Sequence, residues 1–160
     1  MATVHLIHGF LGAGKTTFAR QLERDLKAVR FTHDEWMHRL YGPNSRCEEF
    51  FERYERVASM TWDYTASLVE LGIDVILDFG FWSRASRDQA RAKVSAMGAE
   101  CKLYWLSCPI SLMKTRVRER RGQVPTDSLL IGDHAFDLFL SERFEKLSDD
   151  EICIRIDTDR

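Results

Sequence analysis

A glycine-rich stretch near the amino terminus has the spacing of a phosphate-binding loop. Residues 9–16 read Gly-Phe-Leu-Gly-Ala-Gly-Lys-Thr, which fits the pattern G-x-x-x-x-G-K-[ST]. Glycine permits turns that other residues resist, and the exposed N–H groups of such a loop surround an anion. Lys15 adds a positive charge for the β- and γ-phosphates, and the hydroxyl of Thr16 suits Mg²⁺. The pattern predicts a nucleoside triphosphate site made by Gly9, Gly12, Ala13, Gly14, Lys15, Thr16 and Thr17.

Two aspartates, one just after a predicted strand and one near the end of another, are placed to act beside this loop. Asp34 comes after an apolar run at 28–32, where a carboxylate can take a proton from an acceptor hydroxyl or hold Mg²⁺ through water. The alternative is that Asp34 caps the helix that follows it. Asp78 lies near the end of the run at 73–79, where a carboxylate is rarely left unless paired or near a metal. We expect Thr16 and Asp78 to form the metal side of the site, or Asp78 to make only a structural contact to Thr16.

A basic stretch predicts a second set of groups for the nucleotide. Four arginines, Arg116, Arg118, Arg120 and Arg121, crowd the end of a helix just before Gly122. Arginine can clamp phosphoryl oxygens or stack on adenine, although a solvated helix end is the ordinary role of such a run. We expect Arg116 and Arg120 to bind the nucleotide from a short lid at about 116–133. Lys15, Asp34 and Arg120 are then the predicted catalytic residues.

The acceptor side is less sharply marked. Phe81 follows a predicted strand into a loop, and Arg39, Arg84 and Arg87 could line the same site, although a surface arginine is equally consistent with each position. Asp34, Arg39, Phe81, Arg84 and Arg87 are the predicted acceptor-binding residues. An acidic helix face could attract a cationic acceptor, with a solvated face as the default, and it comprises Glu48, Glu49, Glu52 and Glu55.

The elements that position these residues alternate between strand and helix, which predicts an α/β fold with a parallel sheet. Apolar runs predict strands over 2–8, 28–32, 73–79, 102–107 and 152–156. Apolar residues at helical spacing predict helices over 15–28, 35–41, 48–71, 83–97, 111–121 and 134–146. We expect residues 1–160 to form a single domain with a helical acceptor region at about 34–71.

Composition narrows the class of protein. The chain has 160 residues and a formal net charge of −2, so there is no overall attraction to nucleic acid or to an anionic membrane. No apolar run approaches the length of a membrane span, and Lys15 and Arg20 interrupt the early apolar stretch, so we expect no signal peptide. The four cysteines form no C-x-x-C pair, and we expect a cytoplasmic protein with reduced thiols.

The motifs together resemble those of the small P-loop kinases, a group that includes nucleoside monophosphate kinases, shikimate and gluconate kinases, chloramphenicol phosphotransferase, zeta toxins and the kinase domain of polynucleotide kinases. The resemblance rests on Gly9–Thr16, on Asp34 after the second strand, and on the R-x-x-x-R spacing of Arg116 and Arg120. It implies a three-layer P-loop NTPase fold with sheet order 2-3-1-4-5 and helices on both faces. It also implies ATP as donor, Mg²⁺, and an Arg116 that packs on adenine while Arg120 reaches phosphates.

One departure from the group concerns the metal. Shikimate-type kinases carry Asp-x-Asp after the second strand, whereas this chain has Thr32-His33-Asp34, so Asp78 would have to replace the missing acid. No signature names the acceptor.

We therefore predict an ATP- and Mg²⁺-dependent phosphotransferase that acts on a hydroxyl of a small molecule. One alternative is a nucleotide or polynucleotide kinase, in which nucleic acid could be a partner and Arg39, Arg84 and Arg87 would all face the pocket. Another alternative is a nucleotide-switched binding module, although the guanine-reading N-K-x-D motif is missing. No membrane partner is expected, and the oligomeric state stays open.

Overall fold

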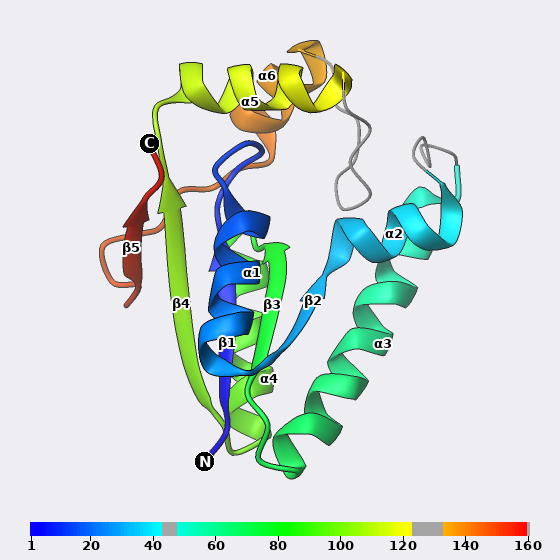
Figure 1. Cartoon of the computed structure of the whole chain (residues 1–160), viewed down its shortest axis with the longest axis vertical. Coiled ribbons are helices and arrows are strands. Elements are labelled where there is room, and N and C mark those ends of the chain that lie inside the picture. The colour runs from blue at the N-terminus through cyan, green and yellow to red at the C-terminus, as the bar shows by residue number, and fades with distance from the viewer. Residues whose placement is uncertain (43–47, 123–132, 160) are drawn as a thin grey trace.

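The computed structural model describes residues 1–42, 48–122 and 133–159, and its centre is a five-stranded parallel sheet (Figure 1). The strand order is β2-β3-β1-β4-β5, and every neighbouring pair is parallel. This confirms the predicted fold class and strand order. The strands are β1 (Thr3–His8), β2 (Val29–Thr32), β3 (Val75–Gly80), β4 (Glu100–Ser107) and β5 (Ile154–Asp157).

Helices cover both faces of the sheet. Within the described residues these are α1 (Lys15–Leu26), α2 (His33–Tyr41), α3 (Phe50–Glu70), α4 (Arg84–Ala96), α5 (Ile110–Gly122) and α6 (Asp133–Glu142). In Figure 1, α1 lies in front of the strands and α4 lies behind them. The helices α5 and α6 lie beyond the carboxyl ends of the strands. Each predicted helix is present, with bounds that differ by a few residues.

Three bounds differ from the prediction for a visible reason. β4 begins at Glu100 rather than 102, because Glu100 and Cys101 pair with Thr3 and Val4 of β1. β5 begins at Ile154 rather than 152, and its pairing with β4 starts there. α6 stops at Glu142 rather than 146, and the chain after it turns so that the N–H of Glu145 donates to the carbonyl of Trp82 over 2.8 Å.

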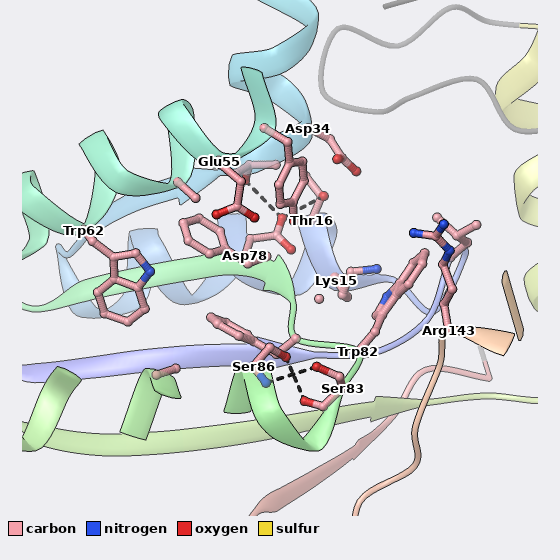
Figure 2. Close-up of a pocket in the computed structure, with 18 of the residues that line it drawn as sticks. Lys15, Thr16, Asp34, Glu55, Trp62, Asp78, Trp82, Ser83, Ser86 and Arg143 are labelled. Carbon is pink, nitrogen blue, oxygen red and sulfur yellow. Dashed lines mark hydrogen bonds between the residues drawn. The ribbon is translucent and has the colours of Figure 1, made fainter. Parts of the chain in front are cut away.

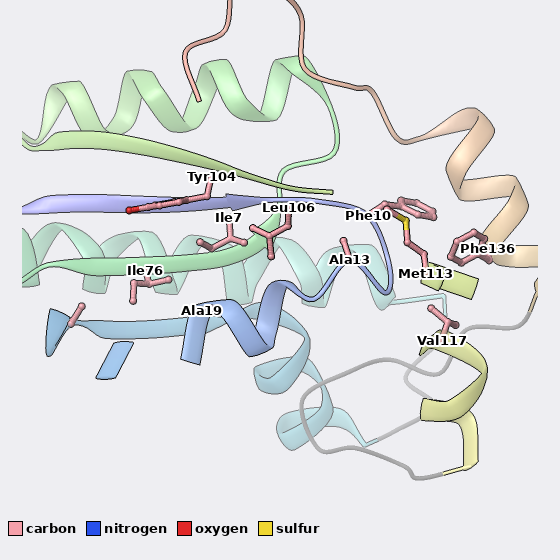
Figure 3. Packing of buried hydrophobic residues seen from close by; sticks show 11 residues of the cluster. Ile7, Phe10, Ala13, Ala19, Ile76, Tyr104, Leu106, Met113, Val117 and Phe136 are labelled. Carbon is pink, nitrogen blue, oxygen red and sulfur yellow. The ribbon is translucent and has the colours of Figure 1, made fainter. Parts of the chain in front are cut away.

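The alternation of side chains along β1 divides the core into two clusters. Val4 and Leu6 face one cluster, which is shared with α4, and Ile7 faces the other, which is shared with α1, α5 and α6. Figure 3 shows the second cluster, in which Phe10 meets Met113 and Phe136 beside the loop that follows β1. Both faces of β1 are buried, as expected for a central parallel strand. The strand is therefore a rigid support for that loop.

Candidate active site

The loop between β1 and α1 has the backbone geometry of an anion cradle. Gly12 and Gly14 have φ angles of 77° and 90°, in the left-handed region that favours glycine. A side chain on Gly12 would also meet a backbone oxygen of α5 at 2.4 Å. Gly14 is the N-cap of α1, makes no side-chain cap, and is followed by no acidic residue in the first turn. The first N–H groups of α1 therefore lack an intrahelical partner and face the loop with the positive end of the helix dipole.

Lys15 extends into this cradle rather than into a salt bridge. Its Nζ donates to the carbonyl of Phe10 over 3.0 Å, which holds the ammonium inside the loop. Burial lowers the pKa of Lys15, and the charges of Asp78 and Asp34 act in the opposite direction. Both carboxylates therefore lie close enough to Lys15 to stabilise its ammonium electrostatically. The position suits an ammonium that neutralises phosphate oxygens.

Asp78 and Thr16 meet where the predicted metal would bind. The hydroxyls of Thr16 and Thr32 donate to Oδ2 of Asp78 over 2.9 Å and 3.0 Å. Asp78 is buried, and burial raises the pKa of its carboxyl, while Lys15 and the two hydroxyls lower it. A carboxylate with a hydroxyl beside it fits Mg²⁺, which is commonly held by one or two carboxylates, waters and substrate phosphates. The described part of the chain holds no group of three or more His, Cys, Asp or Glu residues arranged to hold a metal ion.

These groups open into one cleft of about 1700 Å³. It runs from the phosphate loop, past the ends of β2 and β3, into a groove between α3 and α4. Figure 2 shows Asp34 of α2, Glu55 of α3 and Asp78 of β3 turned into it, with Lys15 beside them. A site for one small ligand measures about 300–1000 Å³. The cleft therefore has room for two ligands side by side.

Arg116 and Arg120 both line the cleft from α5, as the sequence suggests. The guanidinium of Arg116 donates to the carbonyl of Gly12 over 3.1 Å and to the backbone carbonyl of Thr158 after β5. Thr158 in turn donates its hydroxyl to the carbonyl of Ala13 over 2.5 Å. Arg116 therefore braces the phosphate loop against the end of β5, and its packing on adenine stays a prediction. Of the predicted lid, residues 123–132 lie outside the described residues.

The structure does not bring the three predicted acceptor arginines into the cleft. Arg39 is exposed on α2 and does not line it. Arg84 forms a bidentate pair with Asp150 at 2.9 Å for both bonds, on the outer side of α4. Arg87 is fully buried and donates to Glu151 over 2.8 Å and 3.1 Å. The prediction that these side chains line the acceptor site is corrected: two of them serve the packing of α4 and the third faces solvent.

Phe81 does line the cleft, and its backbone is strained. It is 7% exposed and has a φ of 46°, which is uncommon for a residue with a bulky side chain. Nδ1 of His8 donates to its carbonyl over 2.9 Å, and Nη1 of Arg87 donates to the same oxygen over 2.9 Å. Burial lowers the pKa of His8 to about 4, so the ring is neutral at pH 7. Two buried donors thus hold Phe81 in this conformation.

Several cleft residues are not evident from the sequence. Tyr54, Ala58, Trp62 and Ala66 of α3 recur every four residues, the pattern of a core-facing stripe, yet they face the cleft. Glu55, from the acidic face, lines it too. Helical spacing identifies the inner face of α3, but only the position of α3 relative to α4 shows that this face borders an open space.

Comparison with known proteins agrees with this architecture. The sequence matches the family described as AAA domain over residues 4–145, which is most of the chain. The chain belongs to this family. No curated protein matches the sequence significantly.

Within the described residues, no helix has both the length and the apolar character needed to cross a membrane.

Solved structures share the fold at low identity. Kti12 of Chaetomium thermophilum in complex with ADP-AlF3 has a TM-score of 0.73 and 17% identity, over 96% of this chain and 88% of that chain. The APS kinase CysC of Mycobacterium tuberculosis with AMPPNP and APS has a TM-score of 0.67 and 16% identity, over 99% and 90%. A chain of the Pnkp1/Rnl/Hen1 RNA repair complex has a TM-score of 0.70 and 22% identity, over 90% and 46%. This chain therefore shares the fold of these structures, and the loop after β1 carries the P-loop sequence pattern.

Proposed function

We propose that the protein is an ATP-dependent phosphotransferase that moves the γ-phosphate to a hydroxyl of a small molecule. The observation that carries the proposal is the convergence of Lys15, the Thr16–Asp78 pair and Asp34 in one cleft that is large enough for donor and acceptor together. The nucleotides named for two structures of the same fold, ADP-AlF3 and AMPPNP, support ATP as the donor.

Each group has a role that follows from its position. The N–H groups at the start of α1 and the ammonium of Lys15 bind the β- and γ-phosphates. Thr16 and Asp78 would hold Mg²⁺, which supplies charge neutralisation on the phosphate oxygens. Asp34, half-buried on the acceptor side of Lys15, orients the acceptor hydroxyl and accepts its proton. Arg120 stabilises the charge that develops on the transferring group.

The arginine positions favour a small-molecule acceptor over a nucleotide. An acceptor phosphate would need several converging cations, and Arg39, Arg84 and Arg87 lie elsewhere. A nucleotide switch would need room for only one ligand, whereas the cleft continues past the phosphate loop into the groove between α3 and α4. Both observations support transfer to a second bound molecule.

The test measures ADP release with Mg²⁺ and ATP across a panel of nucleosides, mononucleotides, 5′-hydroxyl oligonucleotides, sugar acids and aromatic alcohols, with product mass as confirmation. We expect Lys15→Ala to abolish transfer and Asp34→Asn to lower kcat by about 10²–10⁴-fold, the usual contribution of a general base. Asp34→Asn should leave the Kd for ATP within about twofold of the wild-type value. Asp25→Asn, on the exposed face of α1, is the matched control. Equal loss of ATP binding in Asp34→Asn would refute its role as base.

A further inference from the structure

The groove between α3 and α4 is the part of the cleft that the phosphate chemistry does not use. Its floor is made by Phe79 and Phe81, whose rings stack with centroids 5.5 Å apart. Trp62 of α3 stands edge-on to Phe79, with ring centroids 6.4 Å apart and planes at 88°. Ala58 and Ala66 of α3 and Ala90 of α4 add to the apolar lining. Such a surface offers aromatic faces and edges to a flat or apolar molecule.

The rim of the groove carries mostly negative charge. Asp34, Glu55 and Asp63 line it from the side of α2 and α3, and Lys93 lines it from α4. Nζ of Lys93 lies 4.9 Å from the centroid of the Trp62 ring. Three carboxylates and one ammonium give a formal charge of −2 among the described residues of this part. The other cations that line the cleft are Lys15, Arg116, Arg120 and Arg143, and Figure 2 shows Lys15 near Asp78 and Arg143 near Trp82.

The floor is also the strained part of the cleft. Phe81 keeps its positive φ although it is buried, because His8 and Arg87 both donate to its carbonyl. Residues in such conformations persist only where their surroundings impose them, and they cluster at ligand sites. The ring of Phe81 is therefore fixed in the groove by contacts on the other side of the chain.

We propose that this groove is the acceptor site and that it selects a hydroxyl compound with an aromatic or other apolar body and no anionic group. The inference rests on the proposed phosphotransferase activity. The apolar body lies over Phe79 and Phe81 against Trp62, which directs the hydroxyl toward Asp34. The carboxylates on the rim repel acceptors that carry a carboxylate or a phosphate and tolerate neutral or cationic ones.

The test uses three 2-phenylethanols that carry a carboxamide, an aminomethyl group or a carboxylate at the para position. We expect kcat/KM for the neutral and cationic compounds to exceed that for the carboxylate by about tenfold or more at low salt. The difference should shrink at higher ionic strength, because Glu55, Asp63 and Lys93 on the rim are exposed. The double variant Glu55→Lys/Asp63→Lys changes the formal rim charge from −2 to +2 and should reverse the preference.

A second set of variants tests the apolar floor. Trp62→Ala should raise KM for the carboxamide compound by about tenfold while KM for ATP stays unchanged. In Trp62→Phe, which keeps an aromatic ring, KM for the carboxamide compound should stay close to the wild-type value. Trp105→Ala, on β4 against Arg155 and outside the cleft, is the matched control. Far-UV circular dichroism checks the fold of each variant.

The outcomes separate the two proposals. Transfer that favours the carboxylate compound, or that is unchanged in both Trp62 variants, overturns the assignment of the groove and leaves the phosphotransferase activity standing. No acceptor-dependent ADP release above the Lys15→Ala background, across the three compounds and the wider panel, overturns both.

Discussion

The buried pair between Arg87 and Glu151 gives the sharpest prediction for stability. Both side chains are inaccessible to solvent, and their bonds measure 2.8 Å and 3.1 Å. Arg87 also donates to the carbonyls of Phe81 and Trp82, which line the cleft. Glu151→Gln keeps the shape of the side chain but removes the charge that balances Arg87. The buried guanidinium is then left without its counter-ion.

Two lines of reasoning give the size of the effect. Burial alone would raise the pKa of Glu151, but bonds from Arg87, the N–H of Ser148 and Arg91 outweigh it and leave the pKa at about 2 rather than 4.5. A difference of that size corresponds to about 3 kcal/mol, at about 1.4 kcal/mol for each pKa unit. Removing one partner of a buried ion pair costs about 3–5 kcal/mol in other proteins. We therefore expect Glu151→Gln to lower the free energy of unfolding by about 3 kcal/mol.

The same carboxylate predicts a pH dependence with a definite sign. Because the pKa of Glu151 is lower in the folded state, its contribution is present above pH 4.5 and is lost as the pH falls toward 2. Urea unfolding at pH 7 and at pH 3 measures both effects in wild type and variant. Asp150→Asn, which breaks the exposed pair with Arg84, is the control and should change little. A Glu151→Gln protein within about 0.5 kcal/mol of the wild type at pH 7 would refute the reasoning.

Three further changes test the site and its frame. Gly12→Ala should lower the free energy of urea unfolding more than Gly98→Ala does, and it should also abolish ATP binding. Both glycines have a positive φ, but only at Gly12 would the new Cβ meet a backbone atom at 2.4 Å. Equal losses of stability in the two variants would contradict this. Burial lowers the pKa of His8 and His33 to about 4, so the free energy of unfolding should fall as the pH drops from 6.5 to 4. His33→Gln should make that fall smaller, and an unchanged fall would contradict the explanation. Asp78→Asn should raise the Mg²⁺ concentration for half-maximal turnover by about tenfold, and an unchanged midpoint would exclude Asp78 from the metal side.

The fold was largely predictable because its signals are local. The five apolar runs and the glycine-rich loop after the first of them define the sheet and the phosphate cradle within short segments of sequence. Element ends were less accurate, because they depend on pairing with distant residues. β4, for example, starts at Glu100 because Thr3 lies beside it, and no pattern near residue 100 records that contact.

In the site, too, the residues identified by local sequence signals were predicted correctly, and those that depend on distant partners were not. Lys15, Thr16 and Asp78 were predicted from a motif and from a carboxylate in an apolar strand, and the structure brings them together. Arg84 and Arg87 follow the third strand as acceptor residues would, but their partners Asp150 and Glu151 lie more than sixty positions away. A side chain's type and place in the chain do not fix the direction in which it points.

The position of Arg87 outside the cleft also explains how the cleft is built. The guanidinium of Arg87 donates to Glu151 and to the carbonyl of Phe81, so this cation holds the aromatic floor in place and does not line the cleft. Its pair with Glu151 anchors the start of α4 to the segment before β5, behind the groove rather than in it. The proposed acceptor groove is consequently lined by aromatic rings, three carboxylates and Lys93, while Lys15, Arg116 and Arg120 line the cleft around the phosphate loop. This separation of charge along one cleft is what would allow ATP and an uncharged or cationic alcohol to bind side by side without competing for the same groups.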